Sequence, residues 1–343
     1  MEQQQRMLVT AAPHLHQPLP TARVMWTVSA CLLPAGIWGI VTFGVSSLYI
    51  LLISIASSML TEFVITRIQG KFTLDDGSAF LTGLLIGCNM PPSVPAFIPV
   101  AASVFAIAVV KHTFGGLGRN WMNPALAGRV FVLFSWTPQM TSWAPPRFTA
   151  LTRLLGGTQY ASLVPAEGAY DALSGATALG AGADSFLASG TYWDLFIGNI
   201  PGCIGEVSAL LLILGVVYLV WKGIVSISIP AAYIASFAFF TWLFGGLPSG
   251  AGIAHGAVLF HLFSGGLVLG ALYMATDMVT SPLTNKGMVI YGAGCGILTF
   301  LIRTYGGFPE GVSLAIILMN IAVPLIDRFT GPTVFGKIKE EKK

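Results

Sequence analysis

The chain has 343 residues, of which 55% are hydrophobic and only 9% are charged. Soluble domains carry about 25% charged residues, so this composition excludes a soluble globular protein and predicts an integral membrane protein embedded in a lipid bilayer. The net charge of +3 is too small to argue for nucleic-acid binding.

Ten apolar stretches follow one another along the chain. Each is predicted to be a membrane helix, since a helix needs about 20 apolar residues to cross a bilayer core. They form two groups of five: residues 24–43, 46–66, 79–91, 96–111 and 124–140, then 204–221, 226–245, 256–275, 288–303 and 311–327. The third stretch ends at Pro91-Pro92 and the eighth ends in a polar segment around Asp277, so both are predicted to be broken helices.

The two groups resemble each other in the same order along the chain. Residues 79–87 are similar to residues 262–270, and residues 112–116 are similar to residues 303–307. Because five is an odd number, the second group enters the membrane from the opposite side. The predicted fold is therefore all-α, with about ten transmembrane helices in two inverted five-helix repeats, as in many membrane transport proteins. Chance similarity between glycine-rich segments is the alternative.

Positive charges predict the orientation in the membrane. With the N-terminus in the cytoplasm and ten crossings, fourteen Lys and Arg residues fall on or near the cytoplasmic side. Only Arg147, Arg153 and Arg303 fall outside. The predicted segments are a cytoplasmic N-terminal segment 1–23, a first repeat 24–140, an extracytoplasmic loop 141–203, a second repeat 204–328 and a basic cytoplasmic tail 329–343. The polar first 20 residues do not resemble a signal peptide.

The long loop contains a small, polar, glycine-bearing stretch from Asp171 to Leu179. Long loops without function are uncommon, and glycine lets a backbone approach a bulky ligand closely. Thr177 supplies a hydroxyl, but the loop has no histidine to serve as its base and no Gly-x-Ser-x-Gly pattern is present, so no catalytic nucleophile is predicted. A surface loop or a helix cap is the alternative.

The residues Asp171, Ser174, Gly175, Ala176 and Thr177 together resemble the acceptor motif of bacterial flavin transferases. Those enzymes join the phosphate of FMN to a threonine or serine hydroxyl as a phosphodiester. The resemblance implies that Thr177 is the attachment residue. Its small neighbours would let the modifying enzyme grip the backbone.

Longer strings resemble one protein family, the NqrB/RnfD family. It contains the RnfD component of the Rnf ion-translocating ferredoxin:NAD oxidoreductase complex and, more distantly, the NqrB component of the sodium-pumping NADH:quinone oxidoreductase. The strings are residues 75–85, 114–125, 139–143, 275–282 and 303–311, so the resemblance covers nearly the whole chain. The missing N-terminal extension favours the Rnf component. Residues 264–267 lack the threonine that the family can have there, so no second attachment site is expected.

The resemblance implies a multi-pass electron-transfer subunit of the bacterial cytoplasmic (inner) membrane. It would carry covalent FMN at Thr177 and couple electron transfer to Na⁺ or H⁺ translocation. The implied partners are the other membrane and peripheral subunits of the complex, including a second covalent-FMN subunit and iron–sulfur subunits, and a flavin transferase for maturation. The chain has no dinucleotide fingerprint of its own. A small-solute channel or transporter and a scaffold for partner subunits are the alternatives.

Four polar residues in or near the apolar stretches are further candidates. The family suggests a non-covalent riboflavin near Asn120 and Asn123, whose amides suit the edge of an isoalloxazine ring; capping of the fifth helix is the alternative. Glu62 and Asp277 are ion-path candidates because ionisable residues in membranes are costly, and a place at the membrane interface is the alternative. The four cysteines form no CxxC pair, so we expect no metal site in this chain alone, although one cysteine could join a site shared with another subunit.

Overall fold

The structure, a computed structural model, describes residues 21–70, 73–147, 179, 191–248, 250, 252–306 and 311–331. Every element in these ranges is a helix, which confirms the all-α class. Four helices are long and apolar enough to cross a membrane: α1 (Thr21–Phe43), α2 (Val45–Ile68), α15 (Asn285–Tyr305) and α16 (Val312–Thr330). The chain is therefore a multi-pass membrane protein.

The other apolar stretches are helical too, but they are shorter or interrupted. The elements of the first half are η1 (Leu74–Asp76), α3 (Ser78–Cys88), α4 (Phe97–Val104), its π-helical continuation η2 (Phe105–His112), α5 (Pro124–Ser135) and α6 (Thr137–Met140). After α10 (Tyr192–Ile197) come α11 (Ala209–Trp221), α12 (Ser228–Phe244), α13 (Val258–Phe263), α14 (Leu267–Leu269) and the π-helix η3 (Gly270–Met274). Ten membrane crossings and inverted symmetry stay predictions.

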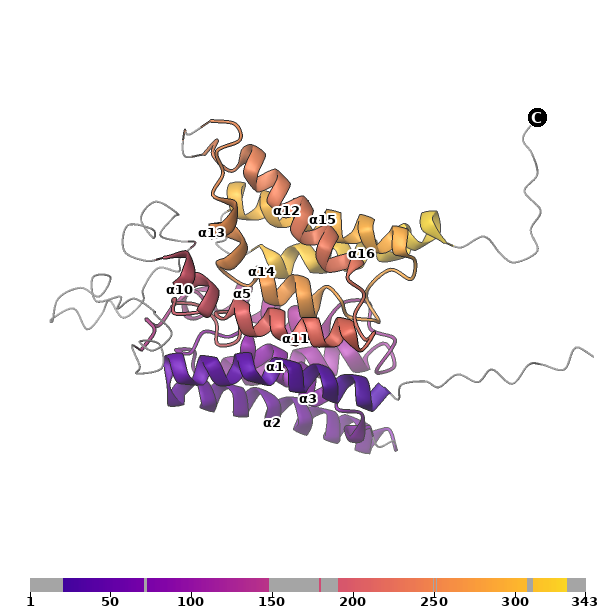
Figure 1. Cartoon of the computed structure of the whole chain (residues 1–343). Coiled ribbons are helices and arrows are strands. Elements are labelled where there is room, and N and C mark those ends of the chain that lie inside the picture. The colour runs from indigo at the N-terminus through magenta and orange to yellow at the C-terminus, as the bar shows by residue number, and fades with distance from the viewer. Residues whose placement is uncertain are drawn as a thin grey trace, which may run out of the picture.

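The two halves of the chain form two groups of helices that face each other (Figure 1). Helices α1, α2 and α3 lie together on one side, and α12, α15 and α16 lie on the other, with α11, α14 and α5 between them. The beginning of α1 and the end of α16 lie at the same end of the bundle, whereas α10 and α13 lie at the opposite end. We call the first of these the terminal end.

The break predicted at Pro91-Pro92 is present, whereas the second half is broken at residues 264–266, before the polar segment around Asp277 where the sequence predicts the break. Helix α3 ends at Cys88, just before Pro91-Pro92, as a proline-rich stop requires. In the second half the chain leaves helix at Ser264 and re-enters it at Leu267. Gly265 lies at this break with a φ of 67°, a conformation that glycine adopts without strain.

The broken end of α3 bonds to a non-helical segment of the second half. The N–H groups of Ile204 and Gly205 donate to the carbonyl oxygens of Met90 (3.1 Å) and Cys88 (2.8 Å). The approach is so close that a Cβ on Gly205 would lie 2.4 Å from the Cβ of Cys88. The prediction that the sixth helix begins at 204 is therefore wrong: α11 begins at Ala209, because residues 204 and 205 supply hydrogen bonds that the end of α3 lacks.

The last part of the predicted loop 141–203 is folded. Thr191 and Asp194 form a reciprocal capping box at the start of α10, and Asp194 is fully buried. Leu195, Ile197 and Ile200 then pack in a second hydrophobic cluster, whose other members come from α1, α13 and the start of the second half. This cluster fixes the chain at the end of the bundle away from the terminal end (Figure 1).

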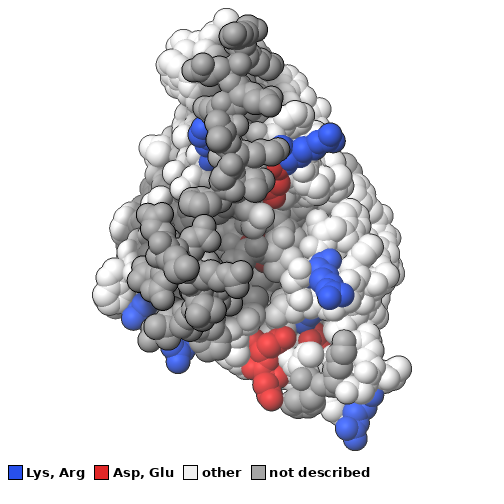
Figure 2. Space-filling model, turned by 90° about the vertical axis from the view of Figure 1, so that its right-hand side faces the viewer, with Lys and Arg blue, Asp and Glu red and all other residues white. Residues whose placement is uncertain are grey.

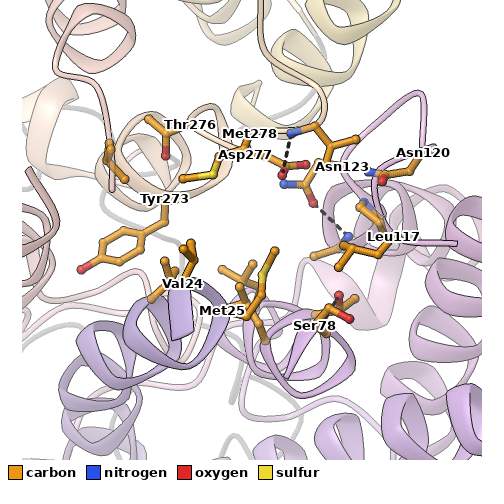
Figure 3. A pocket seen from close by; sticks show the side chains of 18 of the residues that line it. Val24, Met25, Ser78, Leu117, Asn120, Asn123, Tyr273, Thr276, Asp277 and Met278 are labelled. Carbon is orange, nitrogen blue, oxygen red and sulfur yellow. Dashed lines mark hydrogen bonds between the residues drawn. The ribbon is translucent and has the colours of Figure 1, made fainter. Parts of the chain in front are cut away.

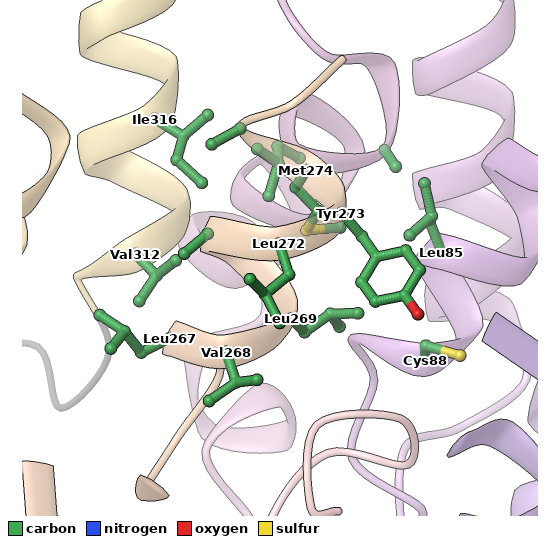
Figure 4. Close-up of a cluster of buried hydrophobic side chains, with 14 of the residues drawn as sticks. Leu85, Cys88, Leu267, Val268, Leu269, Leu272, Tyr273, Met274, Val312 and Ile316 are labelled. Carbon is green, nitrogen blue, oxygen red and sulfur yellow. The ribbon is translucent and has the colours of Figure 1, made fainter. Parts of the chain in front are cut away.

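The main hydrophobic core joins the two halves (Figure 4). Leu272 and Met274 belong to the interrupted segment α14–η3, which lies between α3 on one side and α16 on the other. Tyr273 extends toward the Leu85 and Cys88 side chains of α3 in this view, and its hydroxyl donates to the carbonyl of Leu212 at 3.1 Å. The core thus places η3 where both halves meet.

Candidate functional site

The proposed attachment residues Asp171, Ser174, Gly175, Ala176 and Thr177 lie outside the described residues. The described residue nearest to them in the sequence is Leu179, which ends the same stretch and is partly buried. It lies at the break of the second half, where a Cβ on Gly265 would come within 2.6 Å of Leu179 Cδ1 and 3.1 Å of Arg303 Nη2. Arg303 itself donates to the carbonyls of His261 (2.7 Å) and Ser264 (3.3 Å).

A pocket opens between the two halves and holds about 840 Å³ of empty space, open solvent included. It is lined by the first residues of α1, by α3 and by the segment before α5 on one side, and by η3 and the residues after it on the other. Figure 3 shows Val24, Met25 and Ser78 on the side of the first half, facing Thr276 and Asp277 of the second half. Since α1 begins here, the pocket lies at the terminal end of the bundle.

Asn120 and Asn123 both line this pocket. Asn123 caps α5, because its Oδ1 accepts from the N–H groups of Ala125 (3.0 Å) and Leu126 (3.3 Å). Its Nδ2 donates to the carbonyl of Met274 in η3, at 3.2 Å. Asn123 therefore both caps α5 and lines the pocket. Asn120 is not the cap; its amide donates to the carbonyl of Met122 and is nearly buried.

Asp277 lies on the opposite wall of the pocket from Ser78 (Figure 3). Its carboxylate accepts from the N–H of Val279 (3.4 Å) and from the hydroxyl of Thr280 (3.1 Å), in the turn that follows η3. Burial raises the pKa of this carboxyl group, and these two hydrogen bonds oppose the rise. Asp277 therefore places an acidic group at the edge of an otherwise mostly apolar pocket.

Glu62 is fully buried in α2 and belongs to a network with Lys111 of η2. Lys111 Nζ donates to Glu62 Oε2 at 2.5 Å and to the hydroxyl of Ser78 at 2.6 Å. Thr73 donates to the other oxygen of Glu62 at 2.8 Å, and His112 Nε2 lies 3.6 Å from Oε2. Lys111 and Ser78 also line the pocket, so this charged network and the pocket are continuous.

A second buried ion pair joins the halves near the two helix breaks. Arg129 of α5 donates through Nη1 to Glu206 Oε1 (2.9 Å), Asn89 Oδ1 (2.9 Å) and the hydroxyl of Ser313 (3.0 Å). Its Nη2 contacts the sulfur of Cys203 at 3.6 Å. Three of these partners, Asn89, Cys203 and Glu206, lie at the end of α3 and in the non-helical residues before α11.

Sequence reasoning missed this pair. The charge count puts Arg129 and Lys111 on the cytoplasmic side, yet both are nearly inaccessible and ion-paired, so neither supports an orientation. Glu206 lies just before the sixth helix and is buried against Arg129. The sequence feature that could have revealed the pair is a charged residue inside an apolar stretch, such as Arg129 within 124–140. Such a residue requires a buried partner.

Possible metal ligands are not grouped in the described part of the chain. No set of three His, Cys, Asp or Glu side chains gathers there in a way that would hold a metal ion. Cys31, Cys88, Cys203 and Cys295 are free thiols, three of them buried. Cys88 and Cys203 lie at the two segments that pair across the helix breaks.

These features define a class: a multi-pass membrane protein whose two halves enclose a pocket and share buried ion pairs. The family model described as NQR2, RnfD, RnfE matches residues 8–336, and the chain belongs to that family.

Three relatives match nearly end to end, and each is named as the D component of its complex. The chain is 43% identical to that of the Na⁺-translocating ferredoxin:NAD⁺ oxidoreductase complex of Acetobacterium woodii, over 98% of each chain. It is 40% identical to that of the proton-translocating ferredoxin:NAD⁺ oxidoreductase complex of Clostridium ljungdahlii, over 96% of each. It is 38% identical to that of the ion-translocating oxidoreductase complex of Stutzerimonas stutzeri, over 92% of each.

Proposed function

We propose that this chain is the membrane electron-transfer subunit of an ion-translocating ferredoxin:NAD⁺ oxidoreductase complex of the Rnf type, with FMN attached to Thr177. The observation that carries the proposal is the near full-length match to three relatives named as the D component of ion-translocating oxidoreductase complexes. The stretch from Asp171 to Thr177, with its acceptor-type residues, supplies the cofactor part of the proposal.

The flavin accepts electrons in pairs and releases them singly, which suits a carrier between partners of different kinds. The chain's own contribution is to hold it. Leu179, two residues after Thr177, packs at the break near Gly265 and Arg303, and this contact supports a place for the tether against the second half. A phosphodiester keeps one negative charge, and Arg303 is a nearby cation of the described chain.

The pocket between the halves supports a second, non-covalent flavin, riboflavin. Its lining is mostly apolar, as a flat aromatic ring requires, with Asn120, Asn123 and Asp277 as polar groups at the edge. Asn120 and Asn123 would orient the ring, and the residues of α1 and η3 would exclude water from its faces.

Ion coupling is part of the proposal, but the relatives do not select the ion, since one is named for Na⁺ and another for protons. Glu62 and Asp277 are the residues of this chain that we propose for an ion path. Both carboxylates lie at the terminal end, one beside the pocket wall and one on it. We place this end in the cytoplasm, and the shared position of the two described chain ends supports an even number of crossings (Figure 1).

The terminal end carries charged side chains of both signs among its described residues. Figure 2 looks onto that end and shows separate Lys, Arg, Asp and Glu side chains on a mostly uncharged surface. In this orientation the loop 141–203 is extracytoplasmic and the protein spans the bacterial cytoplasmic membrane. Its partners would be the other membrane and peripheral subunits, including a second covalent-FMN subunit and iron–sulfur subunits, and a flavin transferase.

Covalent attachment is tested by expressing the chain with a flavin transferase and imaging a denaturing gel for flavin fluorescence. We expect a fluorescent band for the parent chain and for Thr177→Ser, because either hydroxyl can accept the phosphate. We expect none for Thr177→Ala, and an unchanged band for the matched control Thr158→Ala in the same loop. Equal fluorescence of Thr177→Ala and the parent would refute the attachment site and favour a channel or transporter without a tethered flavin.

A further inference from the structure

Lys111 is a cation on the pocket wall, and its ammonium group has more hydrogen-bond donors than acceptors around it. An ammonium group has three N–H donors. Two of them are directed to Glu62 Oε2 and the hydroxyl of Ser78, and the described residues offer no third acceptor. Because Lys111 also lines the pocket, its remaining donor is available to a ligand bound there.

The partners of Lys111 make its charge conditional. While the ammonium bonds to Glu62, the two charges offset each other, and this part of the pocket wall presents little net charge to a neutral ligand. A ligand that gains negative charge competes with Glu62 for the same ammonium. The side chain of Lys111 is long and rotatable, so it can turn between the two without movement of the backbone.

The surroundings of Glu62 permit this exchange. Thr73 donates to Glu62 Oε1, and His112 lies beside Oε2, so the carboxylate keeps polar neighbours when the ammonium turns away. Ser78 in turn donates to Asp76, which fixes the orientation of the hydroxyl that Lys111 touches. The network thus holds Lys111 at the pocket wall.

We propose that Lys111 is the counter-charge for the reduced form of the electron carrier in the pocket, and that Glu62 holds its ammonium while the carrier is oxidised. Lys111 is thereby a positioning and tuning residue that raises the affinity of the pocket for the reduced carrier over the oxidised one. This inference rests on the proposed second flavin, for which riboflavin is the probe.

The test measures riboflavin binding to the full-length chain in detergent, in a Thr177→Ala background so that no covalent flavin contributes. Dissociation constants are determined for oxidised and for dithionite-reduced riboflavin at mildly alkaline pH, where the reduced ring is anionic. For Lys111→Met we expect the constant for the reduced form to rise about tenfold and that for the oxidised form to change little. The ratio of the two dissociation constants, reduced over oxidised, therefore rises about tenfold. A tenfold rise in this ratio lowers the two-electron midpoint potential of the bound flavin by about 30 mV. Lys111→Arg should keep the parent ratio.

Glu62→Gln separates tuning from a merely structural role. It removes the competitor for the ammonium, so we expect tighter binding of the reduced form and a ratio that moves opposite to that of Lys111→Met. If Lys111→Met fails to fold because Glu62 is left buried and unpaired, the double variant Lys111→Met/Glu62→Gln removes both charges and should show the same loss of preference.

Two results would overturn the inference in distinguishable ways. If the parent binds neither form of riboflavin, the second flavin and the role of Lys111 both fail. If the parent binds riboflavin but the folded Lys111 variants keep its ratio, or weaken both forms equally, the second flavin stands and the role of Lys111 is wrong.

Discussion

Replacing Arg129 tests how strongly the buried ion pair with Glu206 stabilises the contact between the two halves. Arg129→Met keeps a long apolar stem but removes hydrogen bonds to Glu206, Asn89 and Ser313. Arg129 is only 4% exposed, so solvent screens little of the interaction. Glu206 then loses its guanidinium partner inside the protein. Removing one member of a buried pair costs about 3–5 kcal/mol, and we expect a loss of unfolding free energy in that range.

Matched variants separate the charge from the packing. Arg129→Lys keeps the charge but not the planar fork that reaches several acceptors, so an intermediate loss is expected. The double variant Arg129→Met/Glu206→Met exchanges both charges for apolar side chains, which is often nearly neutral, so it should be more stable than Arg129→Met alone. This non-additivity is the signature of a direct interaction.

The assay is denaturant unfolding of the purified chain in detergent, followed by tryptophan fluorescence, with refolding checked on dilution. The reasoning is refuted if Arg129→Met loses less than about 1 kcal/mol, which is the range of an exposed pair. It is also refuted if the double variant loses as much unfolding free energy as Arg129→Met and Glu206→Met added together. The two residues would then act independently.

Two further predictions concern close contacts between the two halves of the chain. Gly39→Ala would place a Cβ 2.0 Å from the carbonyl oxygen of Ile204, so it should lower the melting temperature, whereas Gly36→Ala, one turn earlier with no contact under 3.7 Å, should not. Equal effects would contradict the close packing of α1. Asn123→Ser should keep a cap of α5 but lose the donation to Met274, whereas Asn123→Ala should lose both and cost about 1 kcal/mol more. Equal unfolding free energies for these two variants would show that the cap contributes nothing.

The sequence alone determined the class of the protein and most of its helices. Apolar length and the scarcity of charge act locally, because a chain in a bilayer must satisfy its own backbone hydrogen bonds, and helices do so within one segment. Residues 24–43 and 46–66 therefore correspond to α1 and α2 within a few residues. Prolines act locally too, which is why the end of α3 before Pro91 is predictable.

The stretch around Thr177 is recognisable because it resembles the acceptor motif of bacterial flavin transferases, and the attachment of FMN there stays a prediction. Asn123 is likewise identified from its place before Pro124. Its bond to Met274 is not, because that contact joins residues 151 positions apart.

Only the tertiary structure decided which charged residues are buried and with which partners they pair. Lys111 and Arg129 look in the sequence like charges near the ends of membrane helices, yet they form buried pairs with Glu62 and Glu206. Hydropathy sums over neighbours in the sequence, whereas a buried charge is stabilised by a partner from a distant segment. The same holds for residues 204 and 205: apolar composition predicts helix there, but the open carbonyls of a broken α3 hold them in a turn, and that requirement exists only once the two halves have met.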